Sequence, residues 1–390
     1  MSKTDAARRD VFSLRLSAFY ATLGLSTGVG MPFFPVWLEY RGIEPAQIGV
    51  ILALPMLVRI FFVPLATRLA DRFNMWRGAL LVGSVGAAIG NASLELVHGF
   101  VPTMAVIVCA AMFFTPTFPL TDAYALRGLA ERGRAYGPVR LWSSVAFIAG
   151  NVGGGFVVAL TGRASILWMM VGAYVAGAAI ALFMAPATPH HTEPHAARPS
   201  AGKSVWRSPL FVAVILACSL VQASHAFYYG FSTIAWTGKG LNDTLVGALW
   251  GLGVIVEIIL FAASARLTAL FGPVAMVVIG AAGAVVRWTA MAFDPPLALL
   301  PLLQCLHALS FAATHLGAMQ FLARVAPAGL GATVQGDFAA AQAMVFAGAM
   351  GVSGVLFRAY GDFGYAAMAL LALVGFAVAL AAYSVRPRDM

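Results

Sequence analysis

Charged residues are scarce in this sequence: Asp, Glu, Lys and Arg make up 10% of its 390 residues, while hydrophobic residues make up 61%. Soluble domains usually carry about 25% charged residues, which they need to cover their surface. The shortage excludes a protein that has water as its only solvent. Apolar runs of about 20 residues instead follow one another along the chain, and this length crosses the core of a bilayer. Because lipid offers no partner to a free backbone N–H, we expect these runs to be helices.

Cysteine is rare as well. Each of the three cysteines falls inside an apolar run without paired spacing, namely Cys109, Cys218 and Cys305. This pattern indicates neither disulfides nor a metal site. Three histidines cluster in one polar stretch, but without the regular spacing of metal ligands: His190, His191 and His195. We therefore expect no metal ion and no other cofactor.

Several enzyme motifs are missing too. The sequence has no Walker loop, no HExxH and no Ser-His-Asp set. Its glycine-rich GNVGGGF, at 150–156, lies inside an apolar run with no strand before it, and close helix packing explains it better than a nucleotide. These absences argue against ATP-driven pumping and against hydrolysis.

Twelve runs are long and apolar enough to cross a membrane: 13–39, 45–67, 77–97, 101–125, 137–161, 164–185, 209–236, 244–265, 273–292, 296–323, 333–357 and 363–385. The first run is too long for a cleaved signal peptide, so we expect it to stay in the protein as a helix. The sequence therefore predicts an all-α membrane protein with twelve transmembrane helices and the lipid bilayer as a partner.

Basic residues predict the orientation, because Lys and Arg are retained on the cytoplasmic side. Most of them lie in the N-terminal segment and in every second loop, and the alternate loops hold only Arg41, Arg163, Lys239 and Arg358. We expect a multi-pass protein of the cell inner membrane with both termini in the cytoplasm. The net charge of +9 is scattered over separate loops, so nucleic acid is not an expected partner.

The chain is an internal duplication. Residues 49–73 align with 247–271 without a gap, at an offset of 198 that is about half the chain, and seven positions are identical. The one long polar, Pro-rich stretch is 186–207, and we expect it to be a cytoplasmic linker. The prediction is a six-helix half in residues 1–185 and another in residues 208–390.

Ionisable residues inside the predicted helices are candidates for function, because a charge in the hydrocarbon is costly unless it pairs or faces water. The alignment places Arg59 opposite Glu257, near the middle of the second and eighth helices, and charge at the midplane of a repeat is typical of secondary transporters. Loss of water favours the neutral form of Glu257, which makes it the candidate proton carrier; a fixed ion pair is the alternative. Arg287, on the ninth helix, is either its partner or an anion receptor.

Asp122 and Arg140 flank the loop between the fourth and fifth helices, and we expect them to approach one another. The alternative for Arg140 is membership of the cytoplasmic basic set.

Polar and aromatic side chains recur at helical spacing on two helices. The seventh carries Gln222, His225, Tyr229, Thr233 and Trp236, and the tenth carries Gln304, His307, Phe311 and His315. For each histidine a simple interhelical hydrogen bond is the alternative. Together the two stripes favour the walls of a binding cavity.

Several segments resemble a known family. RLADR, at 68–72, is similar to a degenerate form of the major facilitator signature after the second helix. More specific are YGPVRLWSSVAFI (136–148), QASHAFYYGFSTIAW (222–236), VGALWGLGVIVEIILF (246–261), VVRW (285–288) and QCLHALSFAATHLGAM (304–319). Together they resemble the phenylpropionic acid permease group, a branch similar to lactose permease, over nearly the whole chain. The resemblance implies the major facilitator fold of two pseudo-symmetric six-helix bundles.

The resemblance also implies roles at five positions: Asp122, Arg140, Glu257, Arg287 and His307. The first two match the acidic and basic pair that contacts the sugar in lactose permease, and the others match polar residues of its eighth, ninth and tenth helices. Ser310 stands where lactose permease has a second carboxylate, so lactose is not expected as the substrate. Proton coupling is then implied for Glu257, with His307 or His315.

The predicted function is proton-coupled import of a small aromatic carboxylate by a monomer, through rocking of the two halves; no enzyme activity is expected. Arg140 or Arg287 would hold the carboxylate, beside Asp122. Side chains predicted around the ring are Trp142, Gln222, His225, Tyr228, Tyr229 and Trp236. Asp71 and Arg72 are expected to close the cytoplasmic side.

Three alternatives remain open at this stage. The first is proton symport of a neutral sugar or nucleoside, and the second is efflux of a hydrophobic compound by proton antiport. The third is a receptor or an intramembrane enzyme that uses a transporter fold without transport.

Overall fold

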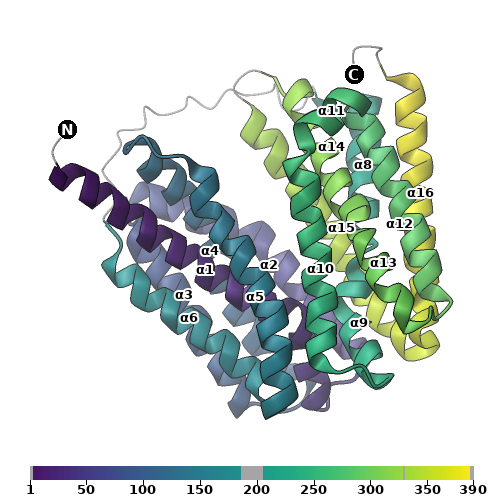
Figure 1. The fold of residues 1–390 in the computed structure, drawn as a ribbon, viewed down its shortest axis with the longest axis horizontal. Coiled ribbons are helices and arrows are strands. Elements are labelled where there is room, and N and C mark those ends of the chain that lie inside the picture. The colour runs from purple at the N-terminus through teal and green to yellow at the C-terminus, as the bar shows by residue number, and fades with distance from the viewer. Residues whose placement is uncertain (1–2, 186–204, 328–329, 387–390) are drawn as a thin grey trace. The chain divides into compact units, whose positions relative to one another are not determined.

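The structure, a computed structural model, describes residues 3–185, 205–327 and 330–386 (Figure 1). In these ranges it contains helices and no strand. The first part of the chain forms α1 (Lys3–Tyr40), α2 (Pro45–Arg72), α3 (Trp76–Ala92), α4 (Phe100–Ala130), α5 (Tyr136–Thr161) and α6 (Ser165–Phe183). The second part forms α8 (Pro209–Ala223), α9 (Ala226–Gly238), α10 (Asp243–Ala262), α11 (Ser264–Phe271), α12 (Pro273–Ala292), α13 (Leu300–Cys305), α14 (Thr314–Val325), α15 (Gly331–Tyr360) and α16 (Tyr365–Val385).

Eleven segments of the described residues are long and apolar enough to cross a membrane. The last of them, Thr333–Val385, is 53 residues long and covers α16 and all of α15 except its first two residues. α15 ends at Tyr360. The next residue, Gly361, has a φ of +55°, which favours glycine, and it begins one short turn that leads into α16. The twelve predicted transmembrane helices are therefore confirmed, although α2 and α4 continue past their predicted ends at 67 and 125.

The chain divides into two compact units, residues 1–191 with 236–251 and residues 192–235 with 252–390. The division at the linker 186–207 stays a prediction, because residues 186–204 lie outside the described residues. The three clustered histidines, His190, His191 and His195, lie outside them as well.

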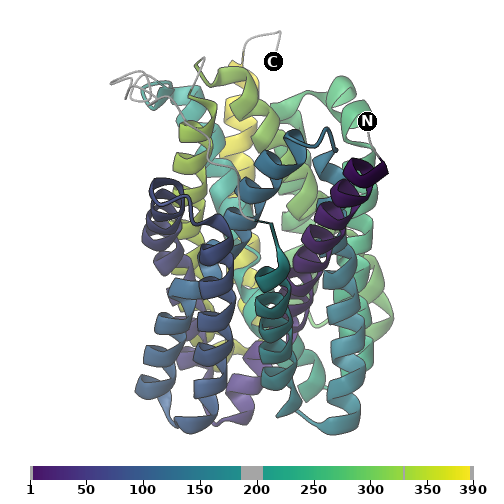
Figure 2. The same cartoon turned by 90° about the vertical axis from the view of Figure 1, so that its left-hand side faces the viewer.

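α1 is central to the first unit, since it packs along both α5 and α6. Figure 2 faces this unit and shows α1, in purple, running obliquely across it. Gly24 and Gly28 allow close approach to α5, because a Cβ at either position would collide with the backbone of Ser143 or Phe147. Gly150, from the GNVGGGF segment, meets the backbone of α1 in the same way, which confirms that close packing explains this segment.

The seventh transmembrane segment is broken, because α8 ends and α9 begins on either side of Ser224 and His225. The Ser224 hydroxyl donates to the carbonyl of Val221 at 2.6 Å, and His225 Nδ1 lies 3.1 Å from the same oxygen. These side chains compete with backbone N–H groups for the last carbonyls of α8. The polar stripe predicted over 222–236 therefore does not follow one unbroken helix.

Candidate functional site

Arg287, on α12, is the centre of a polar cluster in the second unit, and its side chain is fully buried. Its Nη1 donates to His307 Nδ1 at 2.9 Å and to Ser310 Oγ at 3.3 Å. Its Nη2 donates to Gln304 Oε1 at 2.9 Å, and that oxygen also accepts the Tyr228 hydroxyl at 2.9 Å. The cation lies 4.7 Å from the centre of the Tyr228 ring. Neutral acceptors and an aromatic face thus hold this guanidinium.

The contact with Arg287 determines which nitrogen of neutral His307 carries the proton. A guanidinium only donates, so Nδ1 must accept and the ring proton lies on Nε2. This Nε2 is 3.7 Å from Glu257 Oε2, on α10, which is longer than a hydrogen bond. The Glu257 side chain keeps 20% of its surface exposed. Glu257, the candidate proton carrier, therefore lies beside the Nε2–H of His307, and the bond from Arg287 to Nδ1 keeps the ring proton on Nε2. Arg287 itself forms no ion pair with Glu257.

His225 has both ring nitrogens engaged. Nδ1 faces the carbonyls of Val221 at 3.1 Å and Gln222 at 3.2 Å, so it must donate. Nε2 is then free to accept from Ser310 Oγ, 3.0 Å away. The Tyr229 ring packs against His225, with ring centres 5.8 Å apart. This geometry matches the alternative of interhelical hydrogen bonding for His225, and its contact with a substrate stays a prediction.

We expect Arg287→Leu to destabilise the second unit. The substitution leaves His307 Nδ1 without its buried donor and removes one donor each from Ser310 Oγ and from Gln304 Oε1, which keeps the Tyr228 hydroxyl. We expect a cost of about 2 to 4 kcal/mol of unfolding free energy. A lower midpoint of thermal unfolding in detergent would report this loss. Arg266→Leu is the matched control, because Arg266 is exposed on α11 and its loss should leave the midpoint unchanged. Equal midpoints for the two variants would contradict the structural role of Arg287.

A second polar cluster lies in the first unit, around Asp122 on α4. Its Oδ1 accepts the hydroxyls of Tyr20 at 2.6 Å and Tyr136 at 2.7 Å. The same oxygen lies 3.5 Å from Arg140 Nε, so Asp122 and Arg140 approach one another as expected. Neither tyrosine was predicted from the sequence as a partner of Asp122. Tyr136 precedes Arg140 by one helical turn, which was an available signal, whereas Tyr20 comes from α1 and gave none.

Arg140 keeps most of its hydrogen-bonding capacity. Only Nε faces Asp122, and the two Nη groups have no hydrogen-bond partner among the described residues. Its Cζ lies 4.3 Å from the centre of the Phe118 ring and 5.4 Å from that of Tyr20. One third of the side chain is exposed, at 33%. Arg140 therefore presents a forked donor, bordered by aromatic rings, to whatever approaches it.

The other predicted binding residues have varied surroundings. Trp142 is 53% exposed on α5, and Trp236 is buried at 3%. Gln222 donates to the carbonyl of Phe311 at 3.2 Å. The His315 ring stacks on that of Phe311, with centres 6.1 Å apart. Contact of any of them with a substrate or a proton stays a prediction.

The predicted gate residues lie at the end of α2. Asp71 forms an ion pair with Arg127 of the same unit at 2.6 Å. The Arg72 guanidinium lies 5.5 Å from the Phe73 ring. Their role in closing the cytoplasmic side stays a prediction.

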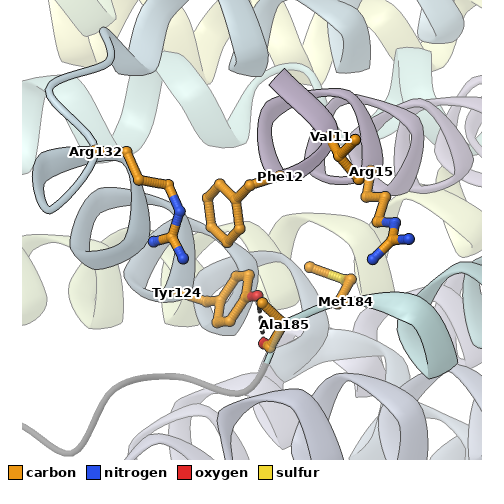
Figure 3. A pocket seen from close by; sticks show the side chains of 7 residues that line it. All are labelled: Val11, Phe12, Arg15, Tyr124, Arg132, Met184 and Ala185. Carbon is orange, nitrogen blue, oxygen red and sulfur yellow. Dashed lines mark hydrogen bonds between the residues drawn. The ribbon is translucent and has the colours of Figure 1, made fainter. Parts of the chain in front are cut away.

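A pocket of about 470 Å³ lies at the ends of α1, α4 and α6 (Figure 3). Its lining comprises Val11, Phe12, Arg15, Tyr124, Arg132, Met184 and Ala185. The Tyr124 hydroxyl donates to the carbonyl of Ala185 at 2.7 Å, and the Arg132 guanidinium lies 4.0 Å from the Phe12 ring. None of the predicted binding residues lines this pocket, so it is separate from the candidate site.

The sequence profile of the MFS_1 like family matches residues 13–377. The chain belongs to this family. It is 32% identical over 317 residues to the "Probable 3-phenylpropionic acid transporter" of Escherichia coli (strain K12), covering 79% of this chain and 81% of that one. It is 28% identical over 335 residues to the "Maltose permease" of Geobacillus stearothermophilus, covering 83% and 80%.

Solved structures show the fold of this MFS_1 like protein. The nucleoside transporter NupG superposes with a TM-score of 0.81 at 15% identity, over 96% of this chain and 98% of the other. A bacterial homologue of the human lysosomal transporter Spinster gives a TM-score of 0.76 at 14% identity, over 98% of both chains. The predicted major facilitator fold is confirmed. As a member of the MFS_1 like family, the chain is a multi-pass membrane transporter and not an enzyme.

Proposed function

We propose that this protein imports a small aromatic carboxylate together with a proton, by alternating access. It acts as a monomer in the inner membrane, with both termini in the cytoplasm. The main support for this proposal is the guanidinium of Arg140, which lies beside two aromatic rings and whose Nη groups are unengaged. A relative described as a probable 3-phenylpropionic acid transporter supports the same substrate class.

Arg140 suits a carboxylate better than Arg287 does. Both Nη groups of Arg287 already donate to neighbours, and its side chain is fully buried. Arg140 is partly exposed and uses only Nε, so its Nη pair is available for two parallel N–H···O bonds. The Phe118 ring offers an apolar face beside the cation for the ring of the substrate.

Glu257 and His307 would carry the proton coupling. Ionised Glu257 gains a donor from His307 Nε2–H after a small approach, since the two atoms are 3.7 Å apart. Arg287 keeps that tautomer in place by donating to Nδ1. Protonation of Glu257 removes the charge, which lowers the cost of moving the carboxyl through a less polar environment.

The charge balance of transport tests the proposal. One proton with one monoanion moves no net charge, so a membrane potential set by potassium and valinomycin at equal pH should leave uptake into proteoliposomes unchanged. One proton with a neutral sugar or nucleoside would gain about 2.3 kcal/mol per 100 mV, or about fiftyfold in accumulation. A strong response to potential would therefore reject the carboxylate in favour of a neutral solute. Accumulation only in inverted vesicles would indicate efflux.

A further inference from the structure

Arg59 lies on the side of α2 that is opposite its large exposed apolar residues. Leu57 is 39% exposed and Phe61 is 72% exposed. Successive residues of a helix are about 100° apart, so a residue two positions from each of them lies on the other side. Arg59 occupies that position and is itself exposed.

The second repeat has the same arrangement. At the offset of 198, Leu57 and Phe61 correspond to Ile255 and Ile259 of α10, which are 44% and 62% exposed. Glu257 lies between them in the sequence, two positions from each, and therefore on the opposite side of α10. His307 approaches it on that side. The duplication thus preserves an apolar exposed stripe with an ionisable residue opposite, and the charge is reversed between the units.

Arg59 has no hydrogen-bond or ion-pair partner among the described residues. It lies near the middle of α2, which spans Pro45–Arg72. An unpaired charge at this depth is costly in lipid, so such residues face water or a polar pathway. Exposure, mid-membrane depth and the lack of a counter-charge together indicate that Arg59 faces the aqueous pathway.

We infer that Arg59 is a second carboxylate-binding residue of the transport pathway, on α2 of the first unit. This inference rests on the proposed function, because it assumes an anionic substrate. Arg140 shares its charge with Asp122, whereas Arg59 has no such neighbour to weaken its attraction for an anion. The substrate carboxylate contacts Arg59 during transit, and neutral analogues lack this contact.

Thiol accessibility tests the position of the side chain. In a variant without the three native cysteines, Arg59→Cys should react with a charged, membrane-impermeant methanethiosulfonate, measured by mass spectrometry. An aromatic carboxylate should slow the reaction. Ile89→Cys is the control, since Ile89 is 62% exposed on α3 and should face lipid and stay unreactive. An unreactive Arg59→Cys, or one that the substrate does not protect, would overturn the inference.

Affinity measurements separate this inference from the proposed function. Arg59→Gln should weaken binding of an aromatic carboxylate about tenfold and leave its neutral amide unaffected, and Arg59→Lys should recover most of the loss. If Arg140→Ala weakens carboxylate binding and Arg59→Gln does not, only the role of Arg59 is wrong. If neither variant distinguishes acid from amide, the aromatic carboxylate itself is the wrong substrate class.

Discussion

Glu257→Gln should abolish uphill accumulation of the substrate while leaving passive exchange across the membrane intact. A pH difference of one unit is worth about 1.4 kcal/mol per proton, so one coupled proton supports about tenfold accumulation. Gln has nearly the same size as Glu257 and cannot bind or release a proton. The variant therefore resembles protonated Glu257 in every step of transport. In proteoliposomes with an imposed pH gradient, we therefore expect internal and external substrate concentrations to become equal.

The control for this variant is another carboxylate outside the predicted pathway. Glu95 forms an ion pair with Arg41 at 2.8 Å, at the end of the third transmembrane segment. Glu95→Gln should keep full accumulation. Retained accumulation in Glu257→Gln would show that another group carries the proton, with His307 and His315 as the next candidates to replace.

Arg140→Ala should weaken binding of an aromatic carboxylate about 30- to 150-fold. Removing one partner of a buried, hydrogen-bonded charge pair costs about 2 to 5 kcal/mol of binding free energy. Because 33% of the Arg140 side chain is exposed, we expect a value in the lower part of this range. Arg140→Lys should not restore affinity, because an ammonium cannot form two parallel bonds to a carboxylate. Dissociation constants of the acid and of its amide, measured by calorimetry, would give the effect.

Arg127→Ala is the matched control, because Arg127 is likewise a partly exposed arginine of the first unit, at 39%, but forms an ion pair with Asp71. It should leave affinity unchanged. Equal weakening of acid and amide by Arg140→Ala would indicate a loss of local structure around Asp122 rather than the loss of a carboxylate ligand.

Much of the fold followed from local chemistry. Apolar runs of membrane length and the repeat at an offset of 198 predicted twelve helices, and their bounds agree with the structure within a few residues at most ends. The break at Ser224 and His225 was not predictable in the same way. It depends on side chains that compete for the carbonyl of Val221, while the hydropathy of the run is continuous.

The candidate site was only partly predictable. Midspan charges such as Glu257 and Arg287 stand out in an apolar sequence because their burial is costly. Gln304 and His307 stood out as members of a polar stripe, but the sequence did not indicate that both accept from Arg287. The partner of Asp122 on α1, Tyr20, did not stand out at all, because a single tyrosine in an apolar run is common. Tyr20 reaches Asp122 from another helix, across 102 positions of sequence.

The order of residues along the chain is enough to predict that this protein crosses a membrane twelve times, that it is an internal duplication, and which ionisable residues are inside its helices. These properties depend on hydrophobicity and spacing, which are local. Three further properties come from the packing of the helices: His307 lies between Arg287 and Glu257, Arg140 keeps its Nη groups unengaged, and Arg59 lacks a partner among the described residues. Hydrogen bonds between helices depend on distances of a few ångströms, and the order of residues along the chain does not contain those distances.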